Sequence, residues 1–219
     1  MKINTDGVLL GSLAGSGKPV SILDIGTGTG VIALMLAQRF ETANVDAVEI
    51  EAAAAQTALK NFRESPFAVR LNAYAVSFEA FFDQYPAMKY DLIITNPPFY
   101  IDSLKSPGAK KTLAKHTDID FFERLMKYAS AHLTAEGDFW LIIPFNFYEQ
   151  LVTLTSGFSL FLKSVIRVSS YTHAQPHRVI VCFGFDKTLP QISSLLIYRS
   201  EGVYSDEYKL LLKPYFLAF

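Results

Sequence analysis

The sequence predicts one doubly wound α/β domain, on two observations. Up to about residue 157, short apolar runs alternate with helix-forming segments. Strands that alternate with helices form a parallel sheet that is covered on both faces. Beyond that point the predicted strands follow one another with little helix between them, which indicates an antiparallel edge.

The composition supports a packed globular domain. Half of the 219 residues are hydrophobic and 19% are charged, which excludes an intrinsically disordered chain. The net charge is −1, so a polyanionic partner would have to meet a local basic patch. We expect no membrane span and no signal peptide, and the single thiol, Cys182, is typical of a packing residue in a cytoplasmic protein.

The first half of the chain carries four expected strands. An apolar run over 20–25 is closed by Gly26-Thr27-Gly28-Thr29-Gly30, and a helix is expected over 31–40. The run at 45–50 precedes an alanine-rich segment, 51–62, which favours helix because alanine has the highest helix propensity. A third strand at 70–76, a short helix at 78–84 and a fourth strand at 90–95 follow.

The second half begins with a loop expected from Asn96 to about residue 117. Asp118 is a suitable N-cap for a helix over 118–133. A fifth strand is expected at 138–143, and Gly157 ends a helix over 146–155. The remaining expected elements are strands at 161–169, 177–185 and 191–199 and a helix at 205–216.

The glycine loop after the first strand is a candidate binding element. Its alternating glycines allow positive φ and a close approach of a ligand to the backbone, but they would also fit a tight turn without a ligand. The spacing lacks both the dinucleotide G-x-G-x-x-G pattern and the Lys of a P-loop. Glu49, at the expected end of the second strand, can accept both ribose hydroxyls of a bound nucleoside, whereas Glu51 more simply opens the next helix.

The loop and this acid together resemble the cofactor site of class I S-adenosylmethionine-dependent methyltransferases. The resemblance implies a Rossmann-like, mostly parallel, seven-stranded sheet with an antiparallel C-terminal edge. It also implies that S-adenosylmethionine binds at Asp24, Gly26, Gly28, Gly30 and Glu49. Many members carry an Asp after strand three, where this chain has Ser77, a weaker acceptor for the adenine of the cofactor.

The string Asn96-Pro97-Pro98-Phe99 follows the fourth expected strand and is the candidate catalytic turn. The Asn96 amide oxygen and the Pro97 carbonyl can hold the two N–H bonds of a ring-conjugated amino group, which frees its lone pair for attack on the sulfonium methyl. Phe99 offers a face on which a flipped planar base can stack. This turn resembles that of adenine-N6 methyltransferases that act on DNA or RNA. It also resembles the turns of guanine-N2 methyltransferases of ribosomal RNA and glutamine methyltransferases of release factors.

Further stretches resemble the bacterial tRNA1(Val) (adenine(37)-N6)-methyltransferases. The matching strings are Thr5-Asp6-Gly7-Val8-Leu9-Leu10-Gly11, Asp46-Ala47-Val48-Glu49-Ile50-Glu51, Ser65-Pro66-Phe67 and Pro176-His177-Arg178. The resemblance implies methylation of adenine N6 in tRNA, with Thr5 and Asp6 against the methionine end of the cofactor. Members carry a further basic and aromatic segment ahead of Thr5, so we expect a single domain over 1–219 that lacks part of this segment.

Basic residues near the catalytic turn are candidates for contacts with RNA. A basic loop beside the catalytic turn can bind the phosphates that flank a flipped base, although a solvated lysine loop without a ligand would have the same composition. A second basic group, near the late strands, includes Lys163, Arg167, His173 and His177. We expect a tRNA partner, no metal and a monomer, with RNA contacts from Tyr100, Lys105, Lys110, Lys111, Lys115, His116 and Arg178.

Overall fold

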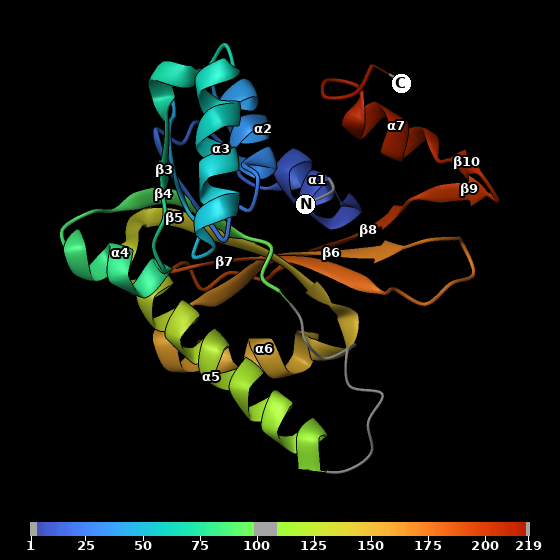
Figure 1. Ribbon diagram of the computed structural model, residues 1–219. Helices are drawn as coiled ribbons and strands as arrows, with labels where there is room; N and C mark the ends of the chain where they lie inside the picture. The colour runs from blue at the N-terminus through green and yellow to red at the C-terminus, as the bar shows by residue number, and fades with distance from the viewer. Residues whose placement is uncertain (1–3, 99–108, 218–219) are drawn as a thin grey trace.

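The computed structural model describes residues 4–98 and 109–217, with the backbone alone for residues 109–118. Its main feature is a sheet in the order β3-β2-β1-β4-β5-β7-β6-β8, covered by helices on both faces (Figure 1). The strands are β1 (Ser21–Ile25), β2 (Asn44–Val48), β3 (Leu71–Tyr74), β4 (Tyr90–Thr95), β5 (Leu133–Pro144), β6 (Phe161–Ser169), β7 (Arg178–Gly184) and β8 (Gln191–Leu196), with β9 (Tyr198–Ser200) and β10 (Val203–Tyr204) as a separate ribbon. The helices are α1 (Thr5–Leu13), α2 (Val31–Arg39), α3 (Ala52–Glu64), α4 (Phe78–Gln84), α5 (Ala109–His132), α6 (Tyr148–Thr155) and α7 (Asp206–Leu212), with 3₁₀ turns at Ala68–Arg70, Phe145–Phe147 and Ser156–Phe158.

The direction of the strands confirms a doubly wound, mostly parallel sheet. Neighbouring strands from β3 to β5 are parallel, whereas β7 runs antiparallel to both β5 and β6. Two details of the expectation need correction. The described sheet has eight strands rather than seven, because β8 pairs in parallel with β6 at the outside. The antiparallel strand also lies inside the sheet, because the chain turns back after β6 and places β7 beside β5.

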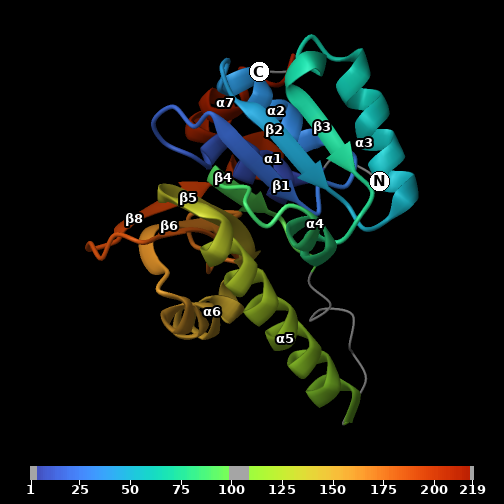
Figure 2. The same ribbon diagram turned by 90° about the vertical axis from the view of Figure 1, so that its left-hand side faces the viewer.

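Two apolar cores lie on the two faces of the sheet. Alternate residues of each strand point to opposite faces, so Leu92 and Ile94 of β4 pack on the side of α1, α2, α3 and α7, and Ile93 packs on the side of α4, α5 and α6. Figure 1 shows these two helical layers above and below the sheet, and Figure 2 shows α5 extending past the sheet edge. Cys182 is buried, as its apolar flanks predict.

Two helices differ clearly from the sequence expectation. The helix α1 was not predicted, because its residues 7–12 are all buried and therefore show no apolar–polar period. Its start is fixed by Asn4, whose side chain accepts a hydrogen bond of 2.7 Å from the Gly7 amide. The helix α5 begins at Ala109, within the segment that was expected to be a loop, whereas α4 and β4 have the predicted bounds.

Candidate active site

The predicted site residues converge at the carboxyl edge of the parallel strands. Ile25, the last residue of β1, pairs with Val48 of β2 on one side and with Thr95 of β4 on the other. The next residue of each strand, Gly26, Glu49 and Asn96 respectively, therefore leaves the sheet at the same level. The strand order reverses at β1, and ligands of doubly wound sheets bind at this switch point.

The three glycines of the loop are required for different structural reasons. All three have positive φ, at 70° for Gly26, 59° for Gly28 and 88° for Gly30. A Cβ on Gly30 would stand 2.4 Å from Phe62 Cε1, so this glycine lets α2 pack on α3. A Cβ on Gly26 would meet no described residue within 4 Å, and Gly26 is exposed. The space above Gly26 is therefore open to a ligand that approaches the backbone.

The Glu49 carboxylate is held in place by two backbone donors. Its Oε2 accepts from the Gly28 amide and its Oε1 from the Glu51 amide, each at 2.9 Å. An ionised carboxylate has about four acceptor positions, so two hydroxyls can still bind to it. Glu49 thus lies directly beside the glycine loop with spare acceptor capacity, as expected for a ribose-binding acid.

The Asp24 carboxyl lies buried beneath the loop. The Thr27 hydroxyl donates to its Oδ2 at 2.6 Å, whereas its Oδ1 has no hydrogen-bond partner among the described residues. Burial raises the pKa of Asp24 to about 7, and the Thr27 hydrogen bond and the Ala33 amide oppose this shift. The charge of Glu49 adds to the increase. A buried carboxyl with an unpaired oxygen and a near-neutral pKa is typical of a ligand site.

The catalytic turn is anchored to the same edge. The Thr95 hydroxyl donates to the Ile25 carbonyl at 2.8 Å, which ties the end of β4 to the end of β1. Asn96 is half-buried, Pro97 is buried and Pro98 is exposed. The first turn of α1 comes close to this turn, because a Cβ on Gly7 would lie 3.7 Å from Asn96 Nδ2.

Several predicted residues lie outside the described part of the chain. These are Phe99, Tyr100 and Lys105. Another four, Lys110, Lys111, Lys115 and His116, belong to the first part of α5, of which only the backbone is described. Their roles therefore stay predictions, and the backbone shows that the last four share one helix.

Asp6 and Arg178, which were expected to bind different partners, contact each other. Arg178 Nε donates to Asp6 Oδ2 at 2.8 Å, and both side chains are about three-quarters covered. Arg178 begins β7 opposite Pro144 at the end of β5, so the pair joins α1 to the sheet edge beside Asn96. Sequence reasoning missed this contact because no local pattern links residues 172 positions apart. Thr5, the residue before Asp6, is exposed.

Ser77 has a local structural role. It is the N-cap of α4 and accepts a hydrogen bond of 3.2 Å from the Ala80 amide. It comes three residues after β3 ends at Tyr74, on the loop where the adenine of a bound cofactor was expected. The cap uses acceptor capacity of the hydroxyl, which leaves it a weak acceptor for a second group.

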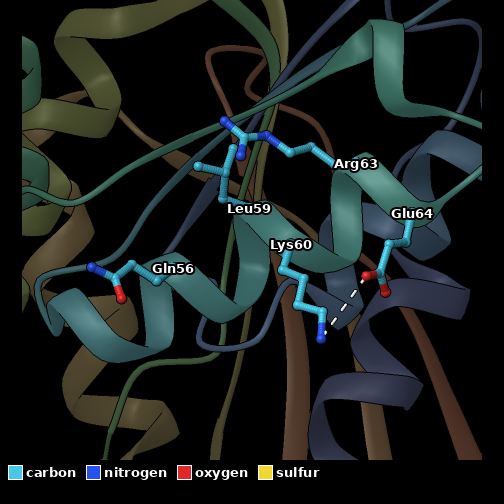
Figure 3. Close-up of a pocket in the computed structure, with 5 residues that line it drawn as sticks. All are labelled: Gln56, Leu59, Lys60, Arg63 and Glu64. Carbon is cyan, nitrogen blue, oxygen red and sulfur yellow. Dashed lines mark ion pairs between the residues drawn. The ribbon is translucent and has the colours of Figure 1, made fainter.

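A shallow hollow lies away from this site. Its volume is about 300 Å³, and it lies on the solvent face of α3, where Lys60 and Glu64 form an exposed ion pair of 3.9 Å (Figure 3). The face of α3 that packs on the protein carries Ala54, Ala55, Ala58 and Phe62 instead. The hollow therefore contains none of the residues predicted to act in binding or catalysis. It is lined by Gln56, Leu59, Lys60, Arg63 and Glu64.

The sheet order and the groups at its carboxyl edge define a Rossmann-like methyltransferase fold. Solved structures support this class. A predicted O-methyltransferase from Agrobacterium tumefaciens superposes with a TM-score of 0.70 over 95% of this chain and 96% of its own, at 18% identity. The ribosomal protein L11 methylase from Lactobacillus delbrueckii subsp. bulgaricus gives 0.57 over 81% and 76%, also at 18% identity.

Sequence comparison then gives the family. The family model described as Methyltransferase small domain matches residues 6–159. A protein from Pedobacter heparinus named tRNA1(Val) (adenine(37)-N6)-methyltransferase is 46% identical over 219 residues, covering 100% of this chain and 92% of its own. Relatives of the same name from Flavobacterium psychrophilum and Parabacteroides distasonis are 38% and 39% identical, each over 99% of this chain and over 93% and 91% of their own. The chain belongs to this family of methyltransferases, which confirms the resemblance found in the sequence.

Membrane-spanning helices and metal sites can be considered for residues 4–98 and 109–217. None of the helices there combines the length and the apolar character that crossing a membrane requires. Among the same residues, no three or more His, Cys, Asp or Glu side chains are grouped so that they could hold a metal ion.

Proposed function

We propose that the protein transfers a methyl group from S-adenosylmethionine to the N6 amino group of an adenine in tRNA. The adenine is the one at position 37, which the names of the relatives give. The observation that carries the proposal is the common level at which Gly26, Glu49 and Asn96 leave the sheet around β1. This arrangement supports a nucleoside site at the sheet edge, directly beside a turn that can hold an amino group. Relatives that match nearly the whole chain are named for this reaction, which would take place in the cytoplasm.

The residues present fit S-adenosylmethionine. The open space above Gly26 admits a ligand to the loop backbone, and the Glu49 carboxylate has capacity for the two ribose hydroxyls. The unpaired Oδ1 of Asp24 supplies a buried acceptor beneath the loop. When bound, the cofactor supplies a methyl group that is already attached to a good leaving group, so the protein needs to supply only position and electrostatics.

In this proposal the catalytic turn orients the substrate. The Asn96 amide oxygen and the Pro97 carbonyl accept the two hydrogens of the adenine amino group, so its lone pair points toward the methyl group. The Thr95–Ile25 hydrogen bond and the proline ring of the buried Pro97 keep these acceptors fixed before the substrate arrives. Phe99 would stack on the base. No side chain has to remove a proton before the attack, since the lone pair becomes available once the nitrogen is drawn toward tetrahedral geometry.

The test compares the substrates that share a planar conjugated nitrogen. Labelled S-adenosylmethionine would be incubated with an unmodified tRNA1(Val) transcript, and in parallel with a ribosomal RNA fragment, duplex DNA and a glutamine-containing release-factor domain. We expect N6-methyladenosine in the tRNA alone, with a KM that rises steeply with salt because phosphates contribute to binding. Label in N2-methylguanosine, in DNA or in glutamine would contradict the proposed substrate.

A further inference from the structure

Four tyrosines form a continuous stack at one end of the sheet. The ring centroids of Tyr171 and Tyr198 lie 5.6 Å apart, those of Tyr198 and Tyr204 5.0 Å, and those of Tyr204 and Tyr208 4.9 Å. The interplanar angles are 30°, 19° and 16°, so the rings are close to parallel throughout. We call these four residues the tyrosine stack.

The inner part of the stack is fixed by the fold. Tyr208 of α7 is buried, and Tyr198 and Tyr204 pack against the core on the side of α1, α2, α3 and α7. The Tyr198 amide donates to the Ser170 carbonyl at 2.9 Å, and the Ser205 hydroxyl accepts from the Tyr208 amide at 3.0 Å. The outermost ring therefore rests on a rigid base rather than on a free loop.

Tyr171 is the exposed end of the stack. Its relative exposure is 41%, and within residues 4–98 and 119–217 it is the one aromatic residue of the exposed class. One face of its ring lies on Tyr198, so the exposed part lies on the remainder of the ring. A flat aromatic ring that is held in place and open to solvent offers a face on which a planar group can stack.

This ring lies on the same edge of the sheet as the active site. Tyr171 follows the end of β6, and β6 runs in the direction of β4 and β5 because both β5 and β6 are antiparallel to β7. Three interstrand spacings, roughly 14 Å, separate β4 from β6 across the sheet. Val165 of β6 is level with Thr95, and β6 continues four residues, roughly 13 Å, beyond it, so Tyr171 lies roughly 20 Å from the Asn96 turn. Figure 1 shows the β6–β7 connection beside β9 and β10, and the Phe145 amide donates to the His177 carbonyl of that connection at 3.2 Å.

The charges around Tyr171 suit a polyanion. Residues 150–185 contain no Asp or Glu. Two of the cations in this range are already paired, Lys163 with Asp138 at 2.6 Å and Arg178 with Asp6 at 2.8 Å. Arg167 is exposed on the other face of the sheet, where its charge acts on Tyr148. The chain around Tyr171 therefore has no acidic residue of its own that would repel phosphate.

We propose that Tyr171 stacks on an unpaired base of the same RNA loop as the adenine that enters the Asn96 turn, more than one nucleotide away from that adenine. The proposal rests on the proposed function and adds a second contact to it. Unpaired RNA bases bind on aromatic faces, and every base has such a face. The inner tyrosines hold the Tyr171 ring in its binding orientation, so little rotamer freedom is lost when a base arrives.

The test replaces the flat ring with an apolar group that cannot stack. Tyr171→Leu, Tyr171→Phe and the loop control Gln175→Ala would be compared in methyl transfer to the anticodon stem-loop of tRNA1(Val). We expect Tyr171→Leu to raise the KM for RNA by about 5- to 150-fold, with kcat at saturating RNA and the dissociation constant of the cofactor unchanged. Tyr171→Phe and Gln175→Ala should keep the wild-type KM.

A second arm identifies the base. Stem-loops that carry a single abasic site at each other unpaired loop position in turn should include one that raises the wild-type KM, and Tyr171→Leu should add nothing further at that position. The inference is overturned if Tyr171→Leu leaves the KM for RNA unchanged, or if the two changes multiply at every loop position. The wild-type enzyme separates this result from the proposed function, since a failure to methylate any RNA would count against that function instead.

Discussion

Replacing Gly26 with alanine separates the cost to the fold from the cost to cofactor binding. Gly26 and Gly202 have almost the same φ, 70° and 69°, and within the described part of the chain a Cβ on either would meet nothing closer than 4 Å. Placing an L-residue in this left-handed region costs about 1–2 kcal/mol. Gly26→Ala and Gly202→Ala should therefore lower the free energy of unfolding by the same amount, measured by denaturant titration.

The two variants should differ in their affinity for the cofactor. Gly202 lies between β9 and β10, whereas the open space above Gly26 is where the ligand meets the loop backbone. A methyl group in a filled contact costs about 1–3 kcal/mol, so the dissociation constant of S-adenosylmethionine should rise about 5- to 150-fold in Gly26→Ala alone. Isothermal titration calorimetry measures it directly. Equal affinity in both variants and in the wild type would refute the placement of the cofactor over this loop.

Three further predictions concern packing, protonation and the α1 contact. Gly30→Ala should lower the free energy of unfolding by about 2–5 kcal/mol, because its Cβ would stand 2.4 Å from Phe62 Cε1. This loss should exceed that of Gly202→Ala, and equal unfolding midpoints for the two variants would contradict the prediction. The pKa of Asp24 is raised to about 7, so its protonated form stabilises the fold below its unfolded pKa and this contribution is lost as pH rises through about 7. The stability of Asp24→Asn relative to the wild type should therefore increase by up to about 4 kcal/mol between pH 4 and pH 7, and a flat difference across urea titrations in that interval would count against a buried, protonated carboxyl. Asp6→Asn and Arg178→Gln should each lose about 1 kcal/mol of stability, with partial recovery in the exchanged pair D6R/R178D and no change in the salt dependence of the KM for tRNA. A salt slope reduced by about 1 in Arg178→Gln alone would instead make Arg178 a phosphate contact.

Much of the site could be predicted because it lies at the ends of strands. Apolar runs locate the strands, and parallel strands end at one edge, so the sequence predicts that Gly26, Glu49 and Asn96 lie together, as they do. The bounds of α4 and β4 could be predicted for a related reason. Ser77 is a good N-cap, and the apolar run of β4 ends where Asn96 and the prolines begin.

The rest depends on long-range contacts that no local pattern encodes. The helix α1 lacks a polar face, so its sequence does not reveal a helix until the fold buries it on all sides. The contact of Asp6 with Arg178 exists only because α1 and β7 meet beside β5. The position of β7 inside the sheet likewise follows from how the chain turns after β6, which strand propensity does not determine.

The most direct test of the central claim is the single-turnover rate of methyl transfer to tRNA in Asn96→Ala, measured alongside Asn44→Ala. Asn44 is an exposed asparagine at the start of β2, at the opposite edge of the sheet, and serves as the matched control. Loss of one preorganised acceptor should lower the rate about 100- to 1000-fold in Asn96→Ala, with the affinity for cofactor preserved and Asn44→Ala unaffected. A wild-type rate of N6-methyladenosine formation in Asn96→Ala would contradict the assignment of this turn as the catalytic site.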